Sequence, residues 1–134
     1  MDYKLELIVV PVADVDVAKA FYMDQAGFDL HVDHSAGDFR VVQLNPPGSS
    51  CSIALMKNFD AAGSLGGLHL LVTDIEAARA DLVGRGLEAS ELYHFTETGQ
   101  TDGPDPERQN YATFFSFDDP DGNGWLVQEV RGSR

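Results

Sequence analysis

Apolar residues follow two different periods along this chain, and the same order of periods occurs twice. A nearly continuous apolar run from Leu5 to Val12 is followed by apolar residues at helical spacing between Val15 and Tyr22. A second apolar run ends at Val72, 60 positions after Val12, and a second helical stripe follows it. An Asp stands two residues after each Val, where the N-cap of a helix belongs. The repeat indicates one module that is present twice.

The first module is predicted to contain one strand, one helix and three further strands. Its first strand, residues 5–12, is apolar on both sides and is therefore expected to be buried on both faces. The helix is capped by Asp14 or Asp16 and ends at Gly27, which occupies the position of a C′ glycine. The further strands are expected at Phe28–Val32, Phe39–Leu44 and Cys51–Met56, with a hairpin turn over residues 34–38.

The second module is predicted to repeat this order after a helix that starts at Asp74. Residues 96–110 follow no period and hold two Gly and two Pro, so they are expected to be a functional cover or disordered. Residues 118–124 are predicted to form a tight turn, and residues 131–134 a disordered tail. The strands of this module are expected at Leu68–Val72, Leu87–Phe95, Tyr111–Phe117 and Trp125–Val130.

Two such βαβββ modules, at about residues 4–57 and 66–130, predict an α+β fold in a single domain. Each module is expected to form a curved mixed sheet with its helix on one face. Because the strands are apolar on both sides, the other two faces are expected to face each other and leave a cleft.

The charge of the chain narrows the classes of partner. The net charge is −13, which repels the phosphates of nucleic acids and of anionic membranes, so neither is expected as a partner. A single cysteine, Cys51, cannot form an internal disulfide, and no apolar run reaches about 18 residues. These features predict a soluble, cytoplasmic protein.

The order of elements and three local motifs resemble the vicinal oxygen chelate superfamily, which includes glyoxalase I, extradiol dioxygenases and bleomycin resistance proteins. The motifs are Phe21-Tyr22 on the first helix, Gly27, and the run from Asp119 to Asn123 before the last strand. The resemblance covers roughly residues 4 to 130. It implies two βαβββ modules around a ligand cleft, and a homodimer.

Enzymes of this superfamily bind one divalent metal through residues on the first and last strand of each module. The matching positions here are Leu7, Gly67 and Leu126, or Val127 if Gly124 is an insertion, and the remaining stretch, residues 52–55, has no carboxylate. Apolar side chains offer no donor to a divalent ion. The resemblance therefore predicts a protein with no metal ligands and no cofactor.

Several residues are candidates for lining the cleft. His69 lies two residues beyond Gly67 on the same side of its strand and is a candidate general base or hydrogen-bond donor. Gln128 shares a side with Leu126 and can both donate and accept. Alternation leaves open whether Phe114 or Phe115, and whether Tyr93 or His94, points inward. The predicted ligand-binding set is Leu7, Gly67, His69, Tyr111, Phe115, Leu126 and Gln128.

Three functions compete on this sequence. The first is a metal-independent binder of a small hydrophobic or aromatic molecule that acts by sequestration, as the resemblance to resistance proteins implies. The second is an enzyme, either a metal-dependent lyase, isomerase or dioxygenase, or a metal-free acid–base catalyst that uses His69. The third is a structural or regulatory dimer with a filled cleft.

Overall fold

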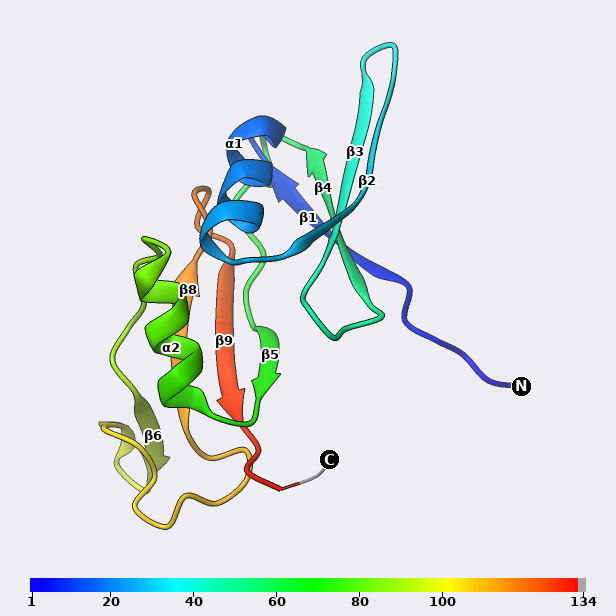
Figure 1. Cartoon of the computed structure of the whole chain (residues 1–134). Coiled ribbons are helices and arrows are strands. Elements are labelled where there is room, and N and C mark those ends of the chain that lie inside the picture. Colours follow the sequence, from blue (N-terminus) through cyan, green and yellow to red (C-terminus); the bar gives the residue numbers. More distant parts are fainter. Residues whose placement is uncertain (133–134) are drawn as a thin grey trace. The chain divides into compact units, whose positions relative to one another are not determined.

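The computed structural model describes residues 1–132 and shows an α+β fold with two mixed sheets (Figure 1). The first sheet has the strand order β1-β4-β3-β2 and the second has the order β5-β9-β8-β6-β7. The chain forms two compact units: unit 1 holds residues 1–65 and 119–123, and unit 2 holds residues 66–118 and 124–132. The elements are β1 (Leu7–Val12), α1 (Val15–Ala20), η1 (Phe21–Gln25), β2 (Asp29–Ala36), β3 (Phe39–Asn45), β4 (Ser52–Lys57), β5 (Leu68–Val72), α2 (Ile75–Gly84), β6 (Tyr93–Thr96), β7 (Gly99–Asp102), β8 (Phe114–Asp118) and β9 (Gly124–Glu129).

The helix of unit 1 begins where the sequence predicted a cap. Of the two candidates, Asp14 is the N-cap, and its carboxylate accepts from the backbone N–H groups of Asp16 at 2.9 Å and Val17 at 3.2 Å. The last turn, η1, widens into a π-helix, in which the N–H of Ala26 donates to the carbonyl of Phe21. This helix covers one face of the first sheet.

The first strand is buried on one face only, which corrects the prediction that both faces are covered. Val10 and Val12 are fully buried, whereas Val9, which points the other way, is 48% exposed. The reason is that unit 1 supplies a helix for only one face of its sheet.

The hairpin of unit 1 has longer strands and a tighter turn than predicted. β2 continues through residues 34–36, so the turn consists of Gly37 and Asp38 alone. Gly37 has φ +60°, a conformation that glycine adopts without steric cost. β2 is the edge strand of its sheet and is exposed along nearly its whole length. Because neither side of it is buried, its sequence shows no apolar alternation.

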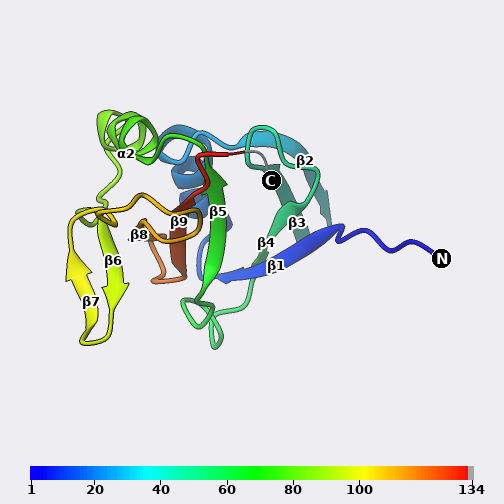
Figure 2. The ribbon, with the colours of Figure 1, turned by 90° about the horizontal axis from the view of Figure 1, so that it is seen from below.

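Unit 2 repeats the first module and adds a strand. β5 pairs in parallel with β9, which pairs antiparallel with β8. The helix α2 starts after Asp74, whose carboxylate accepts from the N–H of Ala77 at 3.0 Å, and lies over one face of the sheet (Figure 2). The additional strand, β7, pairs with β6 at the end of the sheet.

Two predictions for unit 2 need correction. The strand expected over residues 87–95 begins only at Tyr93, and the segment 96–110, expected to be patternless, contains β7. β7 is an edge strand with the polar sequence Gly-Gln-Thr-Asp, and three of its four residues are exposed, so it carries no hydrophobic alternation. The strand expected from Tyr111 begins at Phe114, because Tyr111 adopts a left-handed conformation with φ +67°.

The turn between β8 and β9 belongs to unit 1. The Asp119 carboxylate accepts from the N–H groups of Asp121 and Asn123, each at 2.9 Å, and from the hydroxyl of Tyr22 at 2.8 Å. The side chain of Asn123 donates to the carbonyl of Pro11 at 2.9 Å. The predicted tight turn is therefore confirmed, and these four hydrogen bonds hold it.

Beyond β9, the N–H groups of Arg131 and Gly132 donate to the Asn110 side-chain oxygen at 2.9 and 3.5 Å. The rest of the predicted tail, residues 133–134, lies outside the described residues. In the part of the chain that the structure describes, no helix has the length and apolar character that a membrane span requires.

Candidate functional site

The register of unit 2 places several predicted site residues on one face of its sheet. Residues that are partners in a ladder share a face, and His69 is the partner of Leu126 while Leu71 is the partner of Gln128. On the other side of β9, Ser116 is opposite Leu126 and Phe114 is opposite Gln128. We call this the open face, because α2 covers the opposite one. Its members are His69, Leu71, Tyr93, Phe95, Gln100, Asp102, Phe114, Ser116, Asp118, Leu126 and Gln128.

Four of the seven predicted binding residues are not members of this face: Leu7, Gly67, Tyr111 and Phe115. Gly67 precedes β5 and Tyr111 precedes β8, so neither is part of a ladder. Phe115 is opposite Val127 and is fully buried on the side of α2, so Phe114 is the residue of that pair that reaches the open face. Leu7 lies in unit 1, where its partner on β4 is Ser52. The sequence also left undecided whether Tyr93 or His94 points inward. Tyr93 is the one that lies on the open face, because it is opposite Phe114.

Three aromatic rings gather at the β6 side of the open face. Tyr93 and Phe114 are stacked, with ring centroids 5.8 Å apart and an angle of 15° between the rings. The edge-to-face partner of both is Phe95, at 5.8 Å from Tyr93 and 5.5 Å from Phe114. Tyr93 and Phe114 are buried, whereas Phe95 is 57% exposed. In this cluster the rings of Tyr93 and Phe114 are therefore held by packing, and the ring of Phe95 is the one accessible to a ligand.

Polar groups lie beside this aromatic cluster. The Tyr93 hydroxyl and the Ser116 hydroxyl are 2.5 Å apart, so they share one hydrogen bond. The amide nitrogen of Gln128 donates to the Tyr111 carbonyl at 3.1 Å, which leaves the amide oxygen of Gln128 as an acceptor. Tyr111 itself is 46% exposed. The open face therefore combines a flat apolar surface with a few placed hydrogen-bonding groups.

His69 is held in one tautomer by its neighbour. Its Nδ1 lies 2.7 Å from the carbonyl oxygen of Gly67. A carbonyl only accepts, so Nδ1 carries the proton in this contact and Nε2 is the basic nitrogen of the neutral ring. Gly67, with φ +75°, contributes this carbonyl and no side chain.

The segment that follows β7 is anchored to the face of the sheet opposite the open face. Glu129 of β9 is 1% exposed, and its carboxylate accepts from the backbone N–H of Ile75 at 3.1 Å, at the start of α2. Arg108 donates to the same carboxylate through Nε at 3.2 Å and Nη2 at 2.9 Å, and also pairs with Glu76. Hydrogen bonds to these carboxylates, first Glu76 and then Glu129, raise the pKa of Arg108. The segment is therefore a fixed structure and not a disordered loop.

The side chains at the positions that the resemblance matches to metal ligands offer no donor to a divalent ion. Gly67 has no side chain, Leu126 presents a hydrocarbon to the open face, and Val127 points to the side of α2. Across residues 1–132, no three His, Cys, Asp or Glu side chains are grouped so that they could hold a metal. Such an ion requires oxygen, nitrogen or thiolate sulfur donors.

The sequence missed Phe95 and Ser116 as members of the site, and it left Tyr93 and Phe114 as open alternatives to His94 and Phe115. The turn between β8 and β9 could have placed Phe114 and Ser116. Once Asp118 is paired with Gly124 at the end of this hairpin, every other pair of the two strands is determined. Counting outward from that pair places Phe114 opposite Gln128, which was already assigned to the inner side. Tyr93 and Phe95 have no such local signal, since the pairing of β6 with β8 joins residues far apart in sequence.

The two sheets, each with one covering helix, define the fold of the vicinal oxygen chelate proteins. The chain belongs to the Glyoxalase/Bleomycin resistance protein/Dioxygenase superfamily, whose sequence model matches residues 4–127.

Three relatives illustrate what the chain is similar to. The crystal structure of TnmS3, an antibiotic binding protein from Streptomyces sp. CB03234, is 32% identical with a TM-score of 0.73, over 96% of both chains. A glyoxalase/bleomycin resistance protein from the same Streptomyces is 33% identical with a TM-score of 0.72, over 94% of this chain and 100% of that one. YetH, an uncharacterized protein of Bacillus subtilis (strain 168), is 26% identical over 91% of this chain and 94% of its own length.

Proposed function

We propose that this protein is a metal-independent binder of a flat, hydrophobic or aromatic small molecule, which it holds on the open face of unit 2. The observation that carries the proposal is the aromatic cluster, in which buried Tyr93 and Phe114 support the exposed ring of Phe95. The similarity to an antibiotic binding protein supports the same class of function. The protein would act by sequestering this molecule, and sequestration requires no chemical reaction of the ligand.

The cluster is suited to binding because it is already ordered. Each aromatic contact with a flat ligand adds about 0.5–1.5 kcal/mol beyond the area that it buries. The rings of Tyr93 and Phe114 are fixed by packing, so a ligand that stacks on Phe95 orders few side chains on binding. Gln128 and the Tyr93–Ser116 hydroxyl pair supply the polar contacts that orient a ligand.

The proposal includes a cytoplasmic homodimer that needs no cofactor. An exposed apolar side of β1, where Val9 is 48% exposed, supports association of two copies. The lone Cys51 is compatible with a reducing compartment. Light scattering during gel filtration measures the mass, and a monomer at micromolar concentration would contradict this part of the proposal.

A second candidate function rests on His69. Its Nδ1 is held by Gly67, so its Nε2 is oriented as a base on the same face as Gln128. A metal-free acid–base reaction of a bound ligand would use this nitrogen. Turnover separates the two candidates, because an enzyme turns over its bound ligand and loses that turnover in His69→Gln, whereas a pure binder shows no turnover with either protein.

The proposed function is tested by titrating metal-stripped protein with planar tricyclic dyes by calorimetry and thermal shift. We expect binding, a raised melting temperature, and a roughly tenfold weaker affinity for Phe95→Ala, in line with the loss of one stacking partner. Phe59→Ala is the matched control, because Phe59 is 77% exposed and lies outside the open face. Binding that appears only after Zn²⁺, Ni²⁺, Fe²⁺ or Mn²⁺ is added would favour the metal-dependent enzyme, and no binding at all would favour a structural dimer.

A further inference from the structure

Positive charge is missing from the open face. The strands of the second sheet contain no Lys or Arg, and their charged residues are Asp102, Asp118 and Glu129. Glu129 points to the side of α2, so the open face holds two aspartates, one histidine and no permanent cation in the described part of unit 2. An anionic ligand would therefore meet no compensating charge here.

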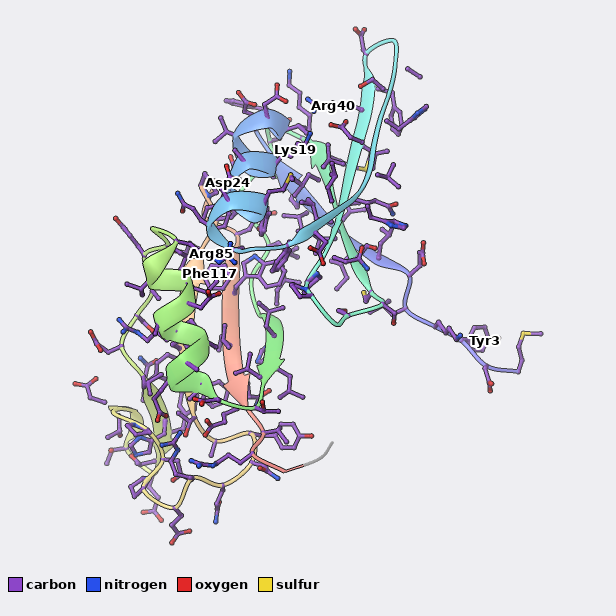
Figure 3. The ribbon with its side chains drawn as sticks, viewed as in Figure 1. Tyr3, Lys19, Asp24, Arg40, Arg85 and Phe117 are labelled. Atoms are coloured by element: carbon purple, nitrogen blue, oxygen red, sulfur yellow. The ribbon has the colours of Figure 1, made fainter. Side chains whose placement is uncertain are left out.

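The cations of the chain that form ion pairs are engaged elsewhere. Lys19 and Arg40 both bind Asp33, at 2.9 and 3.0 Å, beside the helix of unit 1 (Figure 3). Arg108 is bound to Glu129 on the side of α2. Within unit 2, Arg108 would have to break this ion pair before it could approach a ligand on the open face.

One of the two aspartates lies next to the aromatic cluster. Asp102 is the β7 partner of Tyr93, so its side chain is on the same face as the rings of Tyr93, Phe95 and Phe114. Among residues 1–132, no Lys or Arg forms an ion pair with Asp102. A carboxylate beside stacked rings complements a molecule that is both flat and positively charged.

We propose that the open face selects planar aromatic cations over anions of the same shape, and that Asp102 is the residue that confers this preference. The inference rests on the proposed function and adds the charge class of its ligand. It predicts that acidic molecules, such as carboxylates and phosphate esters, bind poorly on this face. Because the carboxylate is exposed to solvent, the preference weakens as the salt concentration rises.

The test compares three tricyclic probes of similar size: proflavine as the cation, 9-anthracenemethanol as the neutral molecule and 2-anthracenecarboxylate as the anion. Their affinities are measured by calorimetry on the full chain at pH 7, with wild type, Asp102→Asn and Asp81→Asn. Asp81 is the matched control, because it changes the net charge equally and lies on α2. We expect the cation to bind tightest, Asp102→Asn to weaken the cation roughly fivefold, and Asp81→Asn to leave it unchanged.

Three other results would overturn the charge preference, the role of Asp102 or both proposals. Equal affinity for the three probes, lost together in Phe95→Ala, would overturn the charge preference and leave the proposed function standing. Equal weakening by Asp102→Asn and Asp81→Asn would overturn the role of Asp102, because net charge alone would then explain the preference. The absence of binding by any probe would overturn both proposals.

Discussion

Removal of Arg108 is predicted to destabilise the protein far more than removal of another exposed-surface arginine. The side chain of Glu129 is only 2% exposed, and among residues 1–132 Arg108 supplies all of its hydrogen bonds except the one from the N–H of Ile75. In Arg108→Ala the carboxylate would stay buried with a single donor. An ionised group in that state is costly, because its hydration is lost and not replaced.

The magnitude follows from the exposure of the two partners. Removing one partner of a fully buried ion pair costs roughly 3–5 kcal/mol. The side chain of Arg108 is 24% exposed, so water can enter the space that it leaves, and the N–H of Ile75 still donates. We therefore expect a loss of about 2–3 kcal/mol, below the range for a fully buried pair. Arg85→Ala, which breaks a surface pair with Asp81, is expected to cost about 0.3–0.5 kcal/mol.

Urea unfolding followed by circular dichroism at pH 7 measures both free energies. An Arg108→Ala loss within 0.5 kcal/mol of the Arg85→Ala loss would refute the reasoning (a difference that small is about the error of the method). The double variant Arg108→Met/Glu129→Leu is a further check. It is expected to recover most of the loss, because a well-packed apolar pair needs no compensation for a buried charge.

Two further predictions concern unit 1. The hydrogen bonds from Arg40 and then Lys19 hold the pKa of Asp33 well below its ordinary value of 3.8. Because the pKa of Asp33 is lower in the folded state, its ionised carboxylate stabilises the folded protein above about pH 4, and this stabilisation is lost as the pH falls further. The stability of Asp33→Asn should therefore depend less on pH below about pH 4. NMR of the wild-type carboxyl groups should show the low pKa of Asp33. Gly63→Ala should lower the melting temperature by several degrees, because its Cβ would lie 2.1 Å from the Asp121 carbonyl oxygen at φ +81°. Gly84→Ala meets no atom within 4 Å and should not lower it.

The sequence correctly predicted those parts of the fold whose signal lies in residues that are adjacent in the sequence. The caps at Asp14 and Asp74, the helices that follow them and the strand β5 each carry a complete local signal. The edge strands β2 and β7 do not, because a strand that is exposed on both sides has no apolar period. The sequence therefore shortened β2 and missed β7.

The candidate site was predicted in the same uneven way. The family resemblance placed Gly67 and Leu126 on the inner side, and the period of two along each strand then added His69 and Gln128. The register of β5 and β9 puts His69, Leu126 and Gln128 on one face. Phe115 was included in the site although alternation left Phe114 and Phe115 open, and its pairing with Val127 places it on the opposite side of the sheet. The link between Arg108 and Glu129 joins residues 21 positions apart, and no local pattern indicates it.

The most direct test of metal-independent binding on the open face is an NMR titration of ¹⁵N-labelled, metal-stripped protein with proflavine. We predict shift changes concentrated at Phe95, Ser116, Leu126 and the side-chain amide of Gln128, without any added metal. Residues on the α2 side of the same strands, such as Val127, should change little. Shift changes confined to other surfaces, or changes that appear only after a divalent metal is added, would contradict the account.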